Sequence, residues 1–228
     1  EELALNTRLG VEKAKARFQE LWHNAIHKHL KLINTENVVG DQVSNARNCY
    51  NIFDFKDDAD NVKYASWGAK GLKDSYDVGP GCGDSSELNY EGISVGVQNN
   101  NVLFGATVWY SRNIFYSYMM NNCNNCFGCV EMNAKQYCIL NKQYTKKEYE
   151  ELMPKIIQHM KDMPYTDKQG RVYAYGEFFP IEISPFSYNE TIAQDYFPLN
   201  SEIVQTKGFR WREYTPGNYT ITIKGQDL

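Results

Sequence analysis

The hydrophobic and polar positions of this chain form three successive patterns. In the first, five apolar residues lie three or four positions apart and so share one face of a helix: Val11, Ala14, Phe18, Trp22 and Ala25. This spacing predicts an amphipathic helix over residues 10–33. Over residues 35–143, glycines and asparagines interrupt short apolar runs, a pattern typical of short strands joined by tight turns.

The middle pattern repeats at a fixed interval. Six polar residues are thirteen positions apart: Asn48, Asn61, Asp74, Glu87, Asn100 and Asn113. Aromatic residues follow the interval more loosely: Tyr50, Tyr64, Tyr76, Tyr90, Phe104, Tyr116 and Phe127. Fixed-period self-similarity predicts a solenoid, here a parallel β-helix. The sequence is compatible with one interval or two intervals per coil. Alternation predicts that two sets of residues point inward: Ile93, Val95 and Val97, then Val102, Phe104 and Ala106.

A second helix is predicted directly after the repeats. Thr145 and Glu148 form a Thr-x-x-Glu capping box, and apolar residues at helical spacing follow it. Pro154 lies inside this run and is expected to kink the helix or divide it into two pieces. Beyond residue 164, frequent prolines predict an irregular segment, with a last short strand around Tyr219, Ile221 and Ile223.

The predicted fold is therefore mainly β. A capping helix occupies residues 1–34, and a β-solenoid occupies residues 35–143. A second capping helix covers residues 144–163, because stacked coils leave both ends of a solenoid open. Residues 164–228 form an irregular C-terminal segment that wraps and packs on the solenoid.

Charge and composition exclude several classes of protein. The net charge of −4 and the lack of a basic run argue against a nucleic-acid partner. No apolar stretch approaches the roughly 18 residues of a membrane span. Six cysteines in 228 residues are too few for a disulfide scaffold, which favours a reducing cytoplasm. The chain begins at Glu1 without an initiator methionine, so we expect it to be part of a longer chain.

Several stretches resemble a family of uncharacterised proteins from candidate phyla radiation bacteria. They are Asn124–Val130, Lys135–Thr145, Gly176–Pro180, Ser184–Phe186 and Tyr188–Gln194. Members of that family carry Asn-Cys repeats and often Cys-x-x-Cys zinc ribbons in a longer chain, so the resemblance implies a possible link to zinc. This chain differs, because most of its repeats carry Tyr, Val or Ile in place of Cys and it has no zinc ribbon.

The cysteines offer one candidate metal site. Cys123, Cys126 and Cys129 are spaced by three, and Cys138 follows nine residues later. Thiolates at this spacing can bind one zinc ion or an iron–sulfur cluster. In a straight strand, however, Cys126 would point away from the other two, so the alternative is that the four cysteines are small core residues. A helical pair, His23 and His27, with His29 beyond it, is a weaker metal candidate.

Other residues suggest a ligand. Exposed aromatics at Trp67, Trp109, Tyr110 and Tyr116 would suit a glycan or peptide, with core stacking as the alternative. An acidic cluster could serve polysaccharide cleavage or bind calcium, or be a solvated corner: Asp54, Asp57, Asp58 and Asp60. No P-loop, dinucleotide fingerprint or serine elbow is present.

We assign no catalytic residue and favour a non-catalytic scaffold or binding module with a protein or glycan partner. The alternatives are a polysaccharide-active enzyme with an acidic or aromatic groove and a metal-stabilised structural module.

Overall fold

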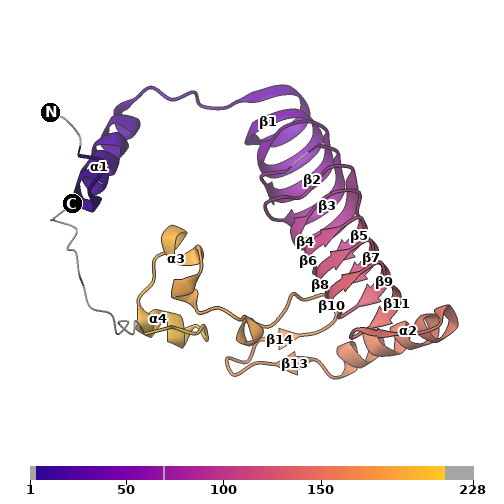
Figure 1. Ribbon diagram of the computed structural model, residues 1–228. Coiled ribbons are helices and arrows are strands. Elements are labelled where there is room, and N and C mark those ends of the chain that lie inside the picture. Colours follow the sequence, from indigo (N-terminus) through magenta and orange to yellow (C-terminus); the bar gives the residue numbers. More distant parts are fainter. Residues whose placement is uncertain (1–3, 69, 214–228) are drawn as a thin grey trace. The chain divides into compact units, whose positions relative to one another are not determined.

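The computed structural model describes residues 4–68 and 70–213 (Figure 1). Residues Leu30–Arg212 form one unit, which holds the solenoid and the segment that follows it as far as Arg212. The helix α1, Arg8–Asn24, belongs to a second unit and is described by itself. It begins at the N-cap Thr7 and ends well before the predicted residue 33. That α1 caps the solenoid stays a prediction.

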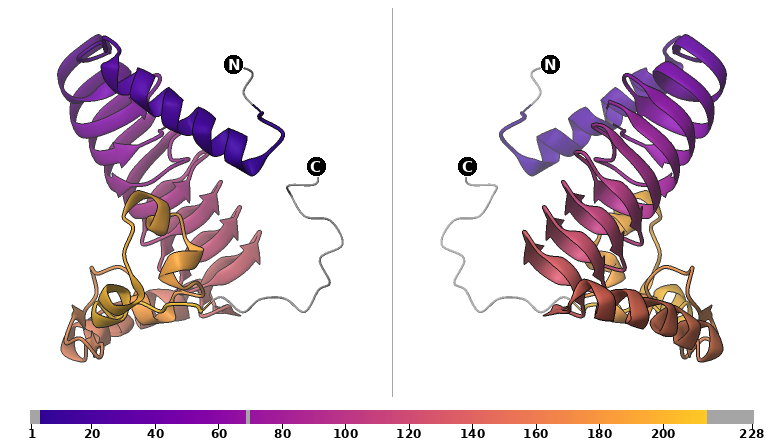
Figure 2. Two further views of the ribbon diagram at one scale, coloured as in Figure 1. Left: turned by 90° about the vertical axis from the view of Figure 1, so that its left-hand side faces the viewer. Right: turned by 90° about the vertical axis from the view of Figure 1, so that its right-hand side faces the viewer.

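The solenoid is a stack of parallel coils, as predicted (Figure 2). Its strands are β1 Leu32–Phe55, β2 Ala59–Ser66, β3 Leu72–Val78, β4 Ser86–Val95, β5 Asn100–Leu103, β6 Ala106–Trp109, β7 Arg112–Phe115, β8 Tyr118–Asn121, β9 Asn124–Phe127, β10 Val130–Asn133, β11 Gln136–Ile139 and β12 Lys142–Gln143. Among the described strands of the solenoid, β12 alone runs antiparallel to its neighbour, β11.

One interval makes one coil, which resolves the alternative that the sequence leaves open. Ala46 pairs with Ala59, and Ala59 pairs with Leu72. Polar side chains that bond between neighbouring coils are eleven residues apart at the start of the solenoid, as in Asn34 and Asn45. They are thirteen apart in coils that follow, as in Arg47 and Asp60. They are twelve apart in the later coils, as in Asn113 and Asn125.

Within a coil the period is three residues, not the predicted two. In β1 every third residue is buried: Val43, Ala46, Cys49, Ile52 and Phe55. The residue before each inward position has a positive φ, near 52–58°, as at Asn45, Asn48, Asn51 and Asp54. Asn and Asp tolerate this left-handed backbone best. The predicted inward positions are therefore correct at Val95 and Val102, which lie in the core, and wrong at two residues. Ile93 is 54% exposed, and Phe104 lies in a separate aromatic cluster on an outer face.

Asparagine side chains also stabilise the stack from outside. Amide groups in successive coils bond to one another, from Asn101 to Asn113 at 2.9 Å and from Asn113 to Asn125 at 3.0 Å. Asn61 donates to Asp74 in the same way at 2.7 Å. The thirteen-residue spacing of polar residues thus reflects backbone conformation and bonding between coils.

The helix α2, Lys146–Asp162, closes the C-terminal end of the solenoid, as predicted. Its capping box is formed, with Thr145 accepting from the Glu148 backbone N–H. The helix remains in one piece through Pro154, so the predicted division does not occur. Tyr149 and Met153 are buried against the last coils, and this packing offsets the hydrogen bond that proline removes.

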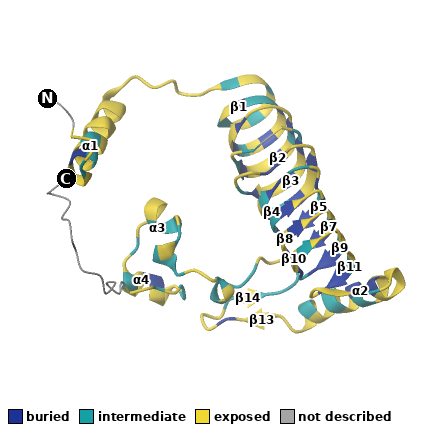
Figure 3. Cartoon of the chain, viewed as in Figure 1, coloured by how far each residue is buried: buried dark blue, intermediate teal, exposed yellow. Residues whose placement is uncertain are grey.

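Residues 164–213 contain only short elements, seen below and beside the solenoid in Figure 3. These are β13 Tyr165–Thr166, β14 Val172–Tyr173, two 3-10 turns at Ile181–Ile183 and Tyr188–Glu190, α3 Ala193–Tyr196 and α4 Ser201–Thr206. The predicted strand around Tyr219–Ile223 lies outside the described residues. No helix in the described part of the chain is long and apolar enough to cross a membrane.

Candidate binding surface

The cysteines lie inside the solenoid. Cys123, Cys126, Cys129 and Cys138 are each fully buried with free thiols. Because the period is three, Cys126 faces inward with its neighbours, so the expectation that it points away is wrong. Among the described residues, no group of three or more His, Cys, Asp and Glu side chains is arranged to hold a metal ion.

The inward cysteines replace serines of neighbouring coils. Ser111 and Ser117 each donate to the carbonyl two residues earlier, at 2.7 and 2.8 Å. Cys123 and Cys129 do the same at 3.2 and 3.5 Å, one coil later. The cysteine backbones also donate to these two serine hydroxyls, at 3.0 Å each. This shared role accounts for the Cys-x-x-Cys-x-x-Cys spacing through packing and hydrogen bonding.

The pKa values of the thiols shift in both directions, because a hydrogen bond with the Cys126 side chain lowers the pKa of Cys129 to about 7. The neighbouring Cys129 side chain and then burial raise the pKa of the Cys126 thiol. Burial raises the pKa of Cys138 as well. Because a bound metal itself deprotonates a coordinating thiol, the core role of these cysteines rests on their packing and hydrogen bonds.

The helical histidine pair that the sequence predicts does not form. Helix α1 ends at Asn24, so only His23 lies on it and the i, i+4 geometry with His27 does not form. The His27 imidazole instead bonds to the backbone carbonyl of Trp22.

Two residues of the acidic cluster, Asp58 and Asp60, line an open groove of about 540 Å3 on the early coils, which basic side chains also line. Asp60 pairs with Arg47 at 2.8 Å, and Glu87 accepts from Asn100 at 2.6 Å. Asp57 has a φ of 72° and accepts from Asn45 at 3.0 Å. Carboxylates held in this way stabilise the corner of a coil, which favours the structural interpretation of the cluster.

The four predicted aromatic ligand residues do not form one surface. Trp67, Trp109 and Tyr110 are exposed, but Trp67 and Trp109 lie at non-equivalent positions of their coils. Tyr116 is buried, at 8% exposure.

Tyr116 belongs instead to a ladder of seven aromatic rings along one outer face of the solenoid: Tyr50, Tyr64, Tyr76, Tyr90, Phe104, Tyr116 and Phe127. Successive ring centroids are 4.5–5.8 Å apart. These seven rings are the aromatic residues that follow the repeat interval in the sequence. The sequence thus indicates the ladder, but it does not indicate that the rings lie on the outside of the solenoid.

The two halves of the ladder differ in exposure. The first three rings, the open ladder, are 46%, 43% and 43% exposed: Tyr50, Tyr64 and Tyr76. The last three, the covered ladder, are 1%, 8% and 7% exposed: Phe104, Tyr116 and Phe127. Tyr90 lies between them with intermediate exposure.

The covered ladder is buried by the same chain. The Gly176 backbone N–H donates to the phenol oxygen of Tyr116 at 2.9 Å. The Phe179 ring packs edge-on against Tyr116, with centroids 5.7 Å apart, and the Tyr175 ring lies 6.0 Å away. Side chains of α2 complete this cluster. Burial raises the pKa of Tyr116 to about 12.

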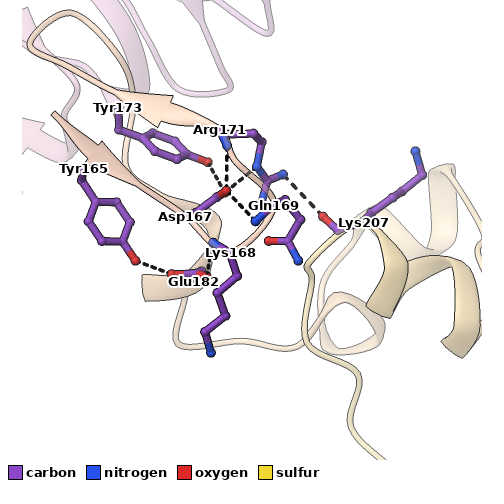
Figure 4. A network of polar contacts seen from close by, with 8 residues as sticks. All are labelled: Tyr165, Asp167, Lys168, Gln169, Arg171, Tyr173, Glu182 and Lys207. Atoms are coloured by element: carbon purple, nitrogen blue, oxygen red, sulfur yellow. Dashed lines mark hydrogen bonds and ion pairs between the residues drawn. The ribbon is translucent and has the colours of Figure 1, made fainter.

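A polar network holds the hairpin that leads into this segment (Figure 4). Asp167, between β13 and β14, accepts from the Arg171 side chain, from the backbone N–H groups of Gln169 and Arg171 at 2.9 Å, and from Tyr173 at 3.2 Å. Burial alone would raise the pKa of Asp167, but the hydrogen bonds and charge of Arg171 outweigh it and lower that pKa. The hairpin is thereby fixed just before Tyr175.

An open groove of about 1030 Å3 adjoins the covered ladder. Tyr118 and Val130 from the solenoid, and Phe178 and Phe186 from the C-terminal segment, contribute to its mainly apolar lining. The groove lies where the C-terminal segment meets the solenoid, and residues of both line it.

Comparison of the chain with protein-family models, curated proteins and solved structures finds no match. The fold and the surface described above therefore carry the functional argument.

Proposed function

We propose that this protein is a non-catalytic binding module and that the open ladder is its binding surface. The observation that carries the proposal is the exposure of three stacked tyrosines on a face whose other half is buried by the same chain. Tyr supplies a large apolar area and a polar hydroxyl at low cost in conformational entropy. Tyrosines are accordingly enriched at the centres of binding interfaces.

The solenoid supports this function by holding the rings in place. Each ring projects from a coil that is hydrogen-bonded to both neighbours, so binding requires little ordering of the surface. Charged side chains on the adjacent face are also paired between coils, as Arg47 is with Asp60. They give the surface a polar border that can orient a ligand.

An enzymatic function finds less support. Polysaccharide cleavage requires an acid and a base on either side of the bond to be broken. In the acidic groove, Asp60 is paired with Arg47 and Glu87 with Asn100. These partners favour a structural role for both carboxylates.

A binding array with matched variants tests the proposal. The full chain, labelled with a fluorophore, is applied to an array that carries both oligosaccharides and short peptides. We expect binding that falls at least tenfold in the triple variant Tyr50→Ala/Tyr64→Ala/Tyr76→Ala. The control Trp109→Ala/Tyr110→Ala removes exposed aromatics outside the ladder and should bind as the parent does. Equal binding by parent and triple variant, or no binding by either, would overturn the proposal.

A further inference from the structure

The covered ladder shows which chemistry this surface accepts. We infer that the open ladder binds a peptide turn of the form aromatic-Gly-x-x-aromatic in a partner protein, an inference that rests on the proposed function. Residues Tyr175–Phe179 are such a turn, and they already occupy the equivalent surface on the covered ladder.

The turn presents two kinds of group to the ladder. The Glu177 backbone N–H donates to the Ala174 carbonyl at 3.2 Å, which closes a four-residue turn. Gly176 is its third residue and has a φ of 112°, a conformation that glycine adopts and other residues avoid. This conformation lets the Gly176 N–H reach the Tyr116 phenol oxygen while Tyr175 and Phe179 pack around the same ring.

Tyr64 reproduces the Tyr116 position on the open ladder. Each lies one residue before an inward residue, Ala65 or Ser117. Their φ values are 53° and 50°. Each ring has an aromatic neighbour in the coils on both sides, at 5.7 and 5.2 Å for Tyr64. At Tyr116, the ring and the phenol oxygen hold the turn. The exposed Tyr64 offers the same two groups on the open ladder.

The ring geometry favours a peptide over a glycan. Sugars bind aromatic side chains by stacking on an exposed ring face. In the open ladder the rings meet at 79° and 62°, so ring edges are turned against the neighbouring faces. Aromatic side chains of a peptide can complete such edge-to-face packing, and a backbone N–H can bond to the phenol oxygen.

A labelled peptide tests the inference. The probe is a synthetic peptide with the sequence of residues 172–182, carrying a fluorophore and titrated with the full chain while its anisotropy is followed. We expect saturable binding that Tyr64→Phe weakens about fivefold through loss of the phenol acceptor. The triple alanine variant should weaken it at least tenfold, and Trp109→Ala/Tyr110→Ala should leave it unchanged.

A second peptide isolates the turn. In the structure, a Cβ added at Gly176 would meet no atom within 4 Å, so Gly176→Ala changes only backbone preference. The Gly176→Ala peptide should bind at least fivefold more weakly than the parent peptide. Equal affinity of the two peptides, or peptide binding that persists in the triple variant, would overturn the inference.

An oligosaccharide separates failure of the inference from failure of the proposed function. Cellohexaose is titrated with the same proteins. Binding of cellohexaose that the triple variant abolishes, with no binding of the peptide, would overturn the peptide inference and leave the open ladder as a binding surface. Failure of both probes, together with a negative array, would overturn both proposals.

Discussion

Gly176 and Tyr116 are joined by a backbone-to-phenol hydrogen bond of 2.9 Å across 60 residues of sequence. The bond connects the irregular C-terminal segment to one ring of the ladder on the outer face of the solenoid. It explains why identical repeat positions differ in exposure, with Tyr64 open and Tyr116 buried. The segment, and not the repeat, decides which part of the ladder is free.

Tyr116→Phe should loosen the segment without disturbing the solenoid. The variant keeps the ring contacts and removes the acceptor of the Gly176 N–H, at a cost of about 1 kcal/mol. Hydrogen exchange followed by mass spectrometry should show faster exchange in residues 172–180 and unchanged exchange in residues 43–66. Tyr64→Phe, the matched control, should leave both regions unchanged. Unaltered exchange in residues 172–180 of Tyr116→Phe would contradict the role of this bond.

The hairpin of β13 and β14, which Asp167 stabilises, should become less stable at acid pH. Its folded-state pKa is lowered, so its contribution is present above the unfolded value near 3.9 and disappears as pH falls through the lower folded value. At neutral pH, cleavage within residues 164–182 by an added protease should be faster for Asp167→Asn than for the parent. The difference should shrink as pH drops below about 4. A constant ratio of cleavage rates from neutral to acid pH would argue against this electrostatic account.

Cys129→Ser should be well tolerated, because Ser117 fills the equivalent position one coil earlier with the same hydrogen bonds. We expect a change of less than about 1 kcal/mol in the free energy of unfolding and no effect of a chelator on the melting temperature. Cys129→Leu should cost about 1–3 kcal/mol through overpacking. A large loss in Cys129→Ser with chelator sensitivity would indicate a metal site instead.

Replacing Asn113 with alanine should lower the free energy of unfolding more than replacing it with glycine. Its φ is 54°, and its amide bonds to Asn101 and Asn125. Asn113→Ala loses both bonds and places alanine in a left-handed conformation, for a total of about 2–3 kcal/mol. Asn113→Gly loses the bonds alone and should be about 1 kcal/mol more stable than the alanine variant. Urea denaturation measures both, and an alanine variant at least as stable as the glycine variant would refute this explanation.

The solenoid and its C-terminal helix follow from the sequence because their signals are local. Asn and Asp recur at many of the left-handed positions, as at Asn48 and Asn61, and Thr145 with Glu148 marks the start of a helix in the local sequence alone. The three-residue period is harder to recognise, since inward positions mix apolar Val102 with polar Ser75 and Asn89. The Cys123, Cys126, Cys129 spacing already contains that period.

The candidate binding surface could be predicted only in part. The aromatic interval reveals the ladder, including Tyr64 and Tyr116, but nothing local distinguishes their environments. Their difference arises from contacts with Tyr175 and Phe179, which are distant in sequence and lie in a segment without periodicity. Long-range packing of this kind leaves no pattern in a single sequence.

The most direct test of the central claim is a nuclear magnetic resonance titration of tyrosine-labelled protein with the 172–182 peptide. Tyrosine-to-phenylalanine variants assign the ring resonances. The account predicts that the resonances of Tyr50, Tyr64 and Tyr76 shift progressively, while that of Tyr110 stays in place. Shifts confined to tyrosines outside the open ladder, or no shifts at saturating peptide, would contradict it.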